Sequence, residues 1–265
     1  MNRTLTPLNG ASLTHSQIVP SQNIANWFDR QKLALPAQRS TTATAHSCFA
    51  PMHYESGYAY PLIVWLHGPD SNEDELRQVM PLISTRNQVA IAPRGTGRVE
   101  SGVGAYRWDD SVDGIAEAGE RVADCIAIAK QRFNIHPDRI FIAGHSVGGT
   151  MAHRLGMEFP EQFAGAISLG GGVPRGSRLL KHINRVRQLP LLLSVSPAIA
   201  GDVEGDVGNY SLERVMDDVR FLHCAGLSLS LQLYPAGDEL TTVMFEDIDN
   251  WVMEQFCPSN ASTAS

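Results

Sequence analysis

The pentapeptide Gly144-His145-Ser146-Val147-Gly148 matches the pattern G-x-S-x-G, in which a serine hydroxyl is the nucleophile. In this pattern the serine occupies a sharp turn between a strand and a helix, and the glycines leave room for neighbouring backbone. The N-terminus of the helix lies beneath the hydroxyl and favours developing negative charge. The alternative is an ordinary glycine-rich turn, which needs no serine. The pattern predicts Ser146 as the nucleophile of an acyl-transfer reaction.

The elements around this turn are those that the chemistry requires. Apolar runs that are typical of buried strands cover residues 61–66, 89–92, 139–143, 165–169, 189–195 and 227–233. Helical spacing of apolar residues covers 115–133, 150–159 and 245–256. Continuous apolar strands alternating with helices predict an α/β fold with a doubly wound, mostly parallel sheet. In such a sheet the site lies beyond the carboxyl ends of the strands, which restricts the side chains that can take part.

The chain is expected to contain one folded domain between two polar ends. A length of 265 residues suits a single α/β domain with a full core. Residues 1–40 are rich in Ser, Thr, Asn and Gln and predict a loosely structured extension, and residues 258–265 predict a flexible tail. Residues 41–257 are then the folded α/β domain.

Composition argues against several other functions. The net charge of -7 and the lack of a strong basic cluster argue against nucleic acid as a partner. No stretch is long and apolar enough to span a membrane, and the N-terminus has no signal-peptide core. No C-x-x-C pair occurs, so neither a zinc site nor a redox motif is indicated, and reduced thiols fit a cytoplasmic protein. No metal or organic cofactor is expected. The cysteines are Cys48, Cys125, Cys224 and Cys257.

Six short stretches resemble a known family in their order and spacing. They are Leu66-His67-Gly68, Ala92 to Gly95, Trp108-Asp109, Asp138 to Ile140, the serine motif extended to Gly149, and Ser168 to Pro174. The chain resembles the phospholipase/carboxylesterase group of α/β hydrolases, which includes acyl-protein thioesterases and feruloyl-esterase-like proteins. The resemblance implies the α/β-hydrolase fold, a small-molecule ester or acyl ligand, and cleavage of a carboxylic ester or thioester through an acyl-enzyme on Ser146.

The resemblance also implies a catalytic acid and a histidine base, and this chain departs from both. The acid should follow the strand at 191–195, where Asp202 is the nearest candidate and Asp206 the next; a solvated acidic loop is the alternative. The histidine should follow the last strand, where this chain has Asp238, and no histidine occurs after His223. A carboxylate with a pKa near 4 is a poor base for a hydroxyl.

Other histidines are weighed as replacements for this base. His67 ends a strand on the correct side and His182 follows a loop that leaves that side, so these two are the candidates for a surrogate base. For each, a structural or exposed histidine is the alternative. His145 is expected to pack against the sheet. His153 lies seven residues along the helix after the serine, roughly 10 Å down its axis.

The oxyanion hole shows a second departure. One donor is expected from the N–H of Val147. The resemblance places the other on the residue after His-Gly, but that residue is Pro69, which has no N–H. Asp70 could supply the next N–H. In the long loop 95–113, Tyr106 and Trp108 are expected as apolar walls of a substrate cleft, with loop packing as the alternative.

Two functions follow from these observations. The first is a serine hydrolase of the carboxylesterase type, with weak or altered activity. The second is a catalytically inactive α/β-hydrolase-fold protein that binds a ligand or a partner. Pro69 and Asp238 favour the second function, and the intact serine motif favours the first. The sequence is therefore interpreted as an ester hydrolase whose turnover is impaired.

Overall fold

A computed structural model describes residues 44–100, 102–175, 182–196, 211–235 and 240–256. The described elements belong to one compact unit within Ser40–Ser265. The expected extension at 1–40 and tail at 258–265 lie outside the described residues. None of the described helices is long and apolar enough to cross a membrane.

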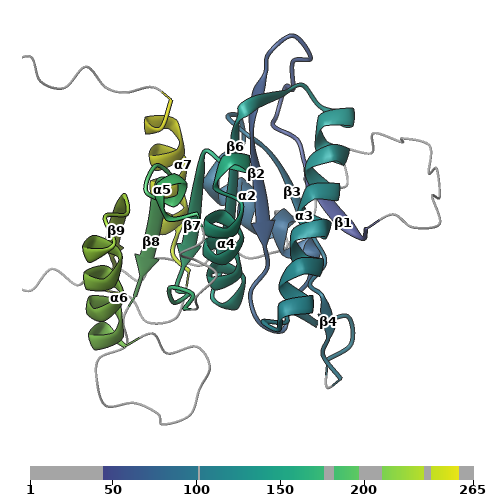
Figure 1. The fold of residues 1–265 in the computed structure, drawn as a ribbon. Coiled ribbons are helices and arrows are strands. Elements are labelled where there is room, and N and C mark those ends of the chain that lie inside the picture. Colours follow the sequence, from purple (N-terminus) through teal and green to yellow (C-terminus); the bar gives the residue numbers. More distant parts are fainter. Residues whose placement is uncertain (1–43, 101, 176–181, 197–210, 236–239, 257–265) are drawn as a thin grey trace, which may run out of the picture. The chain divides into compact units, whose positions relative to one another are not determined.

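The described residues form a seven-stranded sheet, and the predicted fold class is confirmed (Figure 1). The strand order is β1-β3-β2-β6-β7-β8-β9. Every neighbouring pair is parallel except β1 and β3, which run antiparallel at one edge. The strands are β1 His46–Phe49, β2 Tyr60–Leu66, β3 Val89–Pro93, β6 Ile135–His145, β7 Gly165–Leu169, β8 Leu191–Val195 and β9 Leu229–Leu233.

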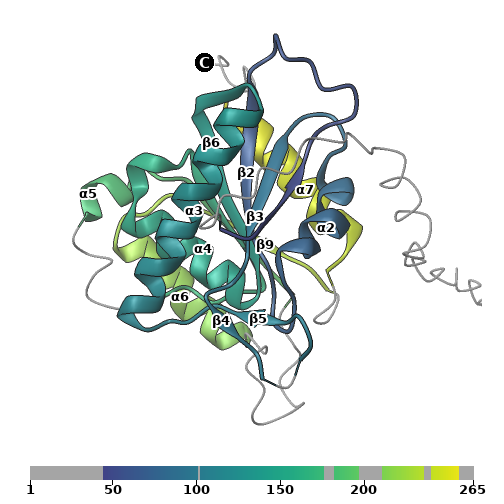
Figure 2. The same ribbon diagram turned by 90° about the vertical axis from the view of Figure 1, so that its right-hand side faces the viewer.

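Helices cover both faces of this sheet (Figure 2). On one face lie α3 Val112–Arg132, α4 Val147–Glu158 and α6 Leu212–Cys224. On the other face lie α2 Leu76–Ile83 and α7 Thr242–Glu254, which contact each other. Burial from both sides explains why β2, β3, β7 and β8 are almost continuously apolar, whereas the edge strands β1 and β9 are only partly buried and carry polar residues.

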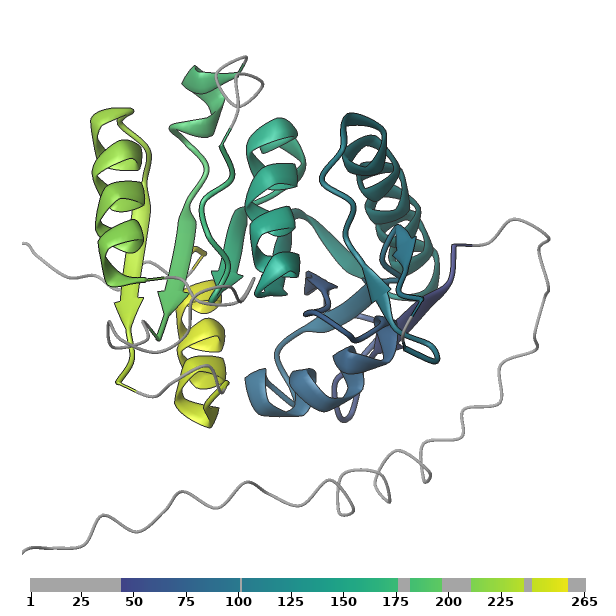
Figure 3. The same cartoon turned by 90° about the horizontal axis from the view of Figure 1, so that it is seen from below.

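The remaining elements are short. They are the 3₁₀ turns η1 Glu73–Glu75 and η2 Pro160–Gln162, the hairpin β4 Gly97–Arg98 with β5 Tyr106–Arg107, and α5 Ile183–Val186. Helix α5 lies at the amino end of β8, whereas the hairpin lies at the opposite end, where the parallel strands finish (Figure 1). Figure 3 looks onto this carboxyl end of the sheet, which is where the fold class places the site.

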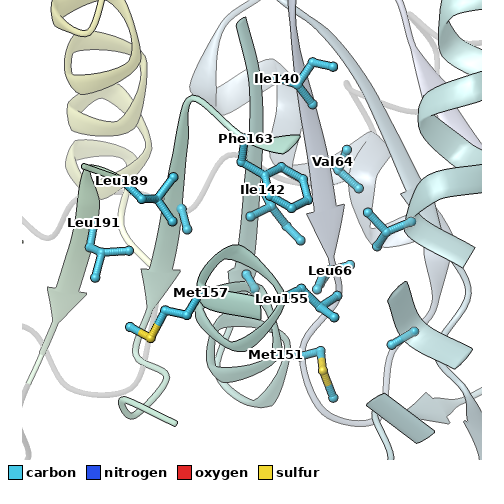
Figure 4. Packing of buried hydrophobic residues seen from close by; sticks show 14 of the residues in the cluster. Val64, Leu66, Ile140, Ile142, Met151, Leu155, Met157, Phe163, Leu189 and Leu191 are labelled. Carbon is cyan, nitrogen blue, oxygen red and sulfur yellow. The ribbon is translucent and has the colours of Figure 1, made fainter. Parts of the chain in front are cut away.

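Helix α4 is central to the core because it packs on β6, β7 and β2. Figure 4 shows Met151, Leu155 and Met157 of this helix among the buried side chains. Its Leu155 side chain is fully buried and lies in one cluster with Ile142 and Phe163. Burying one such side chain contributes about 1.5–3 kcal/mol, so the helix is held firmly against the sheet. The start of α4, where the serine lies, is therefore placed by packing along the whole helix.

Candidate functional site

Ser146 lies at the turn between β6 and α4, in a backbone conformation that residues other than glycine rarely adopt. Its φ is 51° and its ψ is -119°, and it immediately precedes the first residue of α4. Its N–H donates to the carbonyl of Leu169 on β7 at 2.7 Å. Positive φ at a non-glycine residue costs energy and persists only where the surroundings impose it. The geometry is that of a strained strand-to-helix turn that lifts the serine from the sheet.

The close approach of β2 imposes this turn. A Cβ at Gly148 would lie 2.3 Å from the carbonyl oxygen of Leu66 and 2.4 Å from that of His67. These are backbone atoms that cannot rotate away, so only glycine fits. The requirement for glycine at position 148 therefore comes from Leu66 at the end of β2 and from His67 directly after it, which lie outside the sequence motif.

The two predicted oxyanion donors have different surroundings. Val147 is the first residue of α4, and its N–H has no partner within the helix. Asp70 is exposed and has a φ of 52°, which turns the chain sharply after Pro69. The N–H of Gly68 is already used, because it donates to both carboxylate oxygens of Glu75 at 3.1 and 3.2 Å. Because Pro69 has no N–H and the N–H of Gly68 is engaged by Glu75, the N–H of Asp70 is the one at positions 68–70 that could donate to an oxyanion.

Several hydrogen bonds fix the loop that carries Asp70. The carboxylate of Glu75 also accepts from the indole of Trp65 at 2.9 Å. The indole N–H of Trp108 donates to the carbonyl of His67 at 3.0 Å, and the N–H of Tyr106 donates to the carbonyl of Ser71 at 2.8 Å. The loop is thus held in place before any ligand arrives.

The surrogate-base role considered for His67 is not supported by its surroundings. The side chain is fully buried, its Nδ1 lies 2.9 Å from the carbonyl oxygen of Gly68, and its Nε2 accepts from the N–H of Gly95 at 3.1 Å. Backbone groups thus engage both ring nitrogens, with Nδ1 carrying the proton. Burial lowers the pKa of His67 below its usual range, so the ring stays neutral. His67 joins the loops after β2 and β3 through these hydrogen bonds. This favours the alternative that His67 is a structural histidine.

The other histidines weighed as bases are also placed by the structure. His182 caps α5, which contacts η2 before β7, so it lies at the wrong end of the sheet and its surrogate role is corrected. His153 is buried within α4, with Nε2 3.0 Å from the carbonyl oxygen of Leu192, as its position in the helix led us to expect. Burial lowers the pKa of His153 to about 4.

His145, the last residue of β6, is half-buried. Its ring lies against Gly68 in the loop after β2, where a Cβ on Gly68 would come within 2.5 Å of the imidazole Nδ1. The ring therefore lies beside the end of β2, in the space that the missing side chain of Gly68 leaves. The role of Glu75 was missed, because an acidic residue in a turn carries no sequence signal of the backbone groups that it will bind.

The candidates Asp202, Asp206 and Asp238 lie outside the described residues. The strands before them do reach the correct edge, because Val195 at the end of β8 pairs with Leu233 at the end of β9. Their triad roles stay predictions.

The two aromatic candidates differ from each other. Trp108 is buried, and its ring lies tilted at 37° to that of His67 with the centroids 5.1 Å apart, which favours the loop-packing alternative; its role as a cleft wall stays a prediction. Tyr106 is half-buried, and the Arg94 guanidinium lies 4.6 Å over its ring. Arg94 is itself paired with the buried carboxylate of Glu73. Tyr106 remains a predicted contact for substrate.

No group of three or more His, Cys, Asp or Glu side chains in the described part of the chain is arranged to hold a metal ion.

Comparison with known proteins points to esterases. The sequence profile of a family described as Esterase PHB depolymerase matches residues 24–182. A protein of Nocardia uniformis subsp. tsuyamanensis named "Putative esterase NocK" is 29% identical over 120 residues, which are 43% of this chain and 33% of that protein. The aligned region thus spans about a third of the length of this relative.

Solved structures share the fold. A Bacillus cereus carboxylesterase superposes with a TM-score of 0.60 at 16% identity, covering 87% of this chain and 99% of that one. Arabidopsis thaliana SOBER1 superposes with a TM-score of 0.59 at 20% identity, covering 74% and 99% of the two chains. Both support the α/β-hydrolase architecture that the resemblance implied.

Proposed function

The chain belongs to the Esterase PHB depolymerase family, and we propose that it is a serine hydrolase that cleaves a carboxylic ester or thioester through Ser146. The observation that carries the proposal is the strained backbone of Ser146 at the start of α4, with φ at 51°. Nothing in the packing of a simple strand-to-helix turn requires a serine in this conformation. The strain is explained if the Ser146 hydroxyl serves as the nucleophile.

In the proposed reaction the Ser146 hydroxyl oxygen attacks the ester carbonyl and passes its proton to the carboxylate of Asp238, which holds the position of the base in the sequence. The carbonyl oxygen becomes an oxyanion, which the N–H groups of Val147 and Asp70 stabilise. The tetrahedral intermediate expels the alcohol or thiol, which takes up the proton, and an acyl-serine remains. Water then attacks the acyl-serine, and the carboxylic acid leaves. The half-buried Tyr106 contacts the substrate.

The proposed activity is weak because one oxyanion donor is missing and the histidine base is replaced. Pro69 offers no N–H, and the Gly68 N–H is taken by Glu75. Loss of one oxyanion donor costs about 100- to 1,000-fold in rate. The position after β9 that would carry the base holds Asp238, and a carboxylate of ordinary pKa takes a hydroxyl proton poorly.

The test combines turnover with covalent labelling. Wild-type protein, Ser146→Ala and the control Ser56→Ala are assayed on p-nitrophenyl butyrate and treated with a fluorophosphonate, and the labelled peptide is identified by mass spectrometry. Ser56 is exposed and precedes β2, far from the carboxyl ends of the strands. We expect slow turnover and labelling of Ser146 in the wild type and the control, and neither in Ser146→Ala. Equal turnover in Ser146→Ala would show that another group does the chemistry.

The second candidate function is a ligand-binding protein without turnover. The commitment of the Gly68 N–H to Glu75 favours it, because that bond withdraws a donor from the oxyanion side of the site. In that case Ser146 takes no label, while short esters or their carboxylic acids still raise the melting temperature of the protein.

A further inference from the structure

A buried carboxylate on α6 binds the loop that follows β7. The side chain of Asp218 has no exposed surface. Its Oδ2 accepts from the N–H of Val173 at 3.2 Å, and its Oδ1 pairs with the guanidinium of Arg175. Arg175 is half exposed and also lies over the ring of Phe221 on the same helix, with Cζ 6.0 Å from the centroid. Asp218 on α6 thus binds Val173 and Arg175 of loop 170–175.

The same loop lies directly on the serine turn. A Cβ at Gly171 would come within 2.3 Å of the carbonyl oxygen of Ser146 and 2.5 Å of the amide nitrogen of Thr150. The hydroxyl of Ser168 donates to the carbonyl of Gly171 at 2.9 Å. The backbone of loop 170–175 therefore contacts the serine and the first turn of α4.

The serine turn is thus held between two loops. The loop after β2 lies against Gly148 on one side, and loop 170–175 lies against Ser146 on the other, because β6 runs between β2 and β7. A strained conformation survives only while its surroundings impose it. An unpaired buried carboxylate is costly, so Asp218 holds Val173 and Arg175 strongly.

Resting on the proposed ester hydrolysis, we propose that Asp218 is a positioning residue that holds loop 170–175 against Ser146 and so keeps the nucleophile in its reactive conformation. Asp218 acts through Val173 and Gly171 and does not touch the substrate. A shift of about 1 Å at a reacting group can cost about 100-fold in rate. The effect therefore falls on the chemical step more than on substrate binding.

The chain offers a matched control one residue away. Asp217 is an exposed aspartate on the same helix, and its carboxylate accepts from Arg220 at 2.9 Å. Asp218→Ala, Asp218→Asn and Asp217→Asn are compared for kcat and KM on p-nitrophenyl butyrate, for the rate of fluorophosphonate labelling at Ser146 and for melting temperature. Arg175→Gln is added because it leaves the carboxylate and its bond to Val173 in place.

We expect Asp218→Ala to lower kcat and the labelling rate by roughly 10- to 100-fold at temperatures well below melting, with a smaller change in KM. Asp218→Asn should recover part of the loss, because its amide oxygen can still accept from Val173. Asp217→Asn should match the wild type. A folded Asp218→Ala protein that labels at the wild-type rate would overturn the proposal. If Asp218→Ala does not fold, the labelling rates of Asp218→Asn and Arg175→Gln are compared with that of the wild type. Wild-type rates in both of these variants would overturn the proposal.

Hydrogen–deuterium exchange separates this proposal from the proposed function. Peptides covering 144–151 and 170–175 should exchange faster in Asp218→Ala and Asp218→Asn than in Asp217→Asn, whether or not the wild type hydrolyses an ester. Unchanged exchange in both peptides refutes the positioning role. Faster exchange together with a wild type that never labels would retain the positioning role and reject the hydrolase.

Discussion

Replacing His153 should make the stability of the protein less sensitive to acid. The imidazole is completely buried in α4, donates to the carbonyl of Leu192, and has its pKa lowered by burial to about 4. An unfolded histidine has a pKa near 6.5. As the pH falls, the unfolded chain takes up a proton at this residue before the folded protein can. Stability linked to His153 is therefore complete above about pH 6.5 and is lost as the pH falls towards 4.

The size of the effect follows from the two pKa values. A difference of about 2.5 units corresponds to about 3 kcal/mol when the transition is complete. Between pH 7 and pH 5 the unfolded state alone titrates, and the loss should be roughly 2 kcal/mol. Burial also lowers the pKa of His67, so the wild type should lose somewhat more than this in total.

The measurement is urea unfolding of the wild type and His153→Gln at pH 7 and pH 5. Glutamine does not titrate, and its amide can donate to Leu192 as the imidazole does. The free energy of unfolding of His153→Gln should fall by about 2 kcal/mol less than that of the wild type over this range. His53→Asn is the control, because His53 is exposed and asparagine tolerates its φ of 58°. An identical pH dependence in the wild type and His153→Gln would refute a neutral, buried His153.

Three further predictions test the turn, the missing base and the core. Gly148→Ala should destabilise the protein by several kcal/mol in urea unfolding, because its Cβ would meet the carbonyl oxygen of Leu66 at 2.3 Å; a change below about 0.5 kcal/mol would show that the two loops separate easily. Asp238→His should raise esterase turnover by about 100-fold or more, and adding Pro69→Leu should raise it further; background rates in both folded variants would reject the triad assignment. Leu155→Ala should cost about 2–5 kcal/mol by the same unfolding assay, and a neutral result would mean that α4 is loosely packed.

The elements with strong apolar signals were predicted well from the sequence, and those with weak signals were missed. The strand at 165–169 was predicted to the residue, because it is buried on both faces. Helix α6 was missed because only Val215, Asp218 and Leu222 of its residues are buried, and one of these is an aspartate. Helix α2 was missed because it is short and contains Pro81, a residue that usually argues against a helix.

In the candidate site, features that depend on adjacent residues were predictable from the sequence, and contacts between distant loops were not. The conformation of Ser146 was predictable because the motif, the preceding strand and the following helix are adjacent in sequence. The engagement of His67 by Gly95, and of Gly68 by Glu75, was not predictable, because these bonds depend on which loops meet at the edge of the sheet. Trp108 illustrates the limit, because an aromatic side chain in a loop has the same sequence signal whether it lines a cleft or packs inward.

The strained backbone at Ser146 sets the stability of the fold and the proposed catalysis in opposition at a single residue. Holding a side chain at a φ of 51° costs about 1–3 kcal/mol, and glycine would adopt the same conformation without that cost. A descendant of this chain that needed only to bind its ligand would gain stability from the single change Ser146→Gly. Stability selection in the absence of turnover would therefore remove the hydroxyl first, which makes position 146 a sensitive record of whether a lineage still uses its nucleophile.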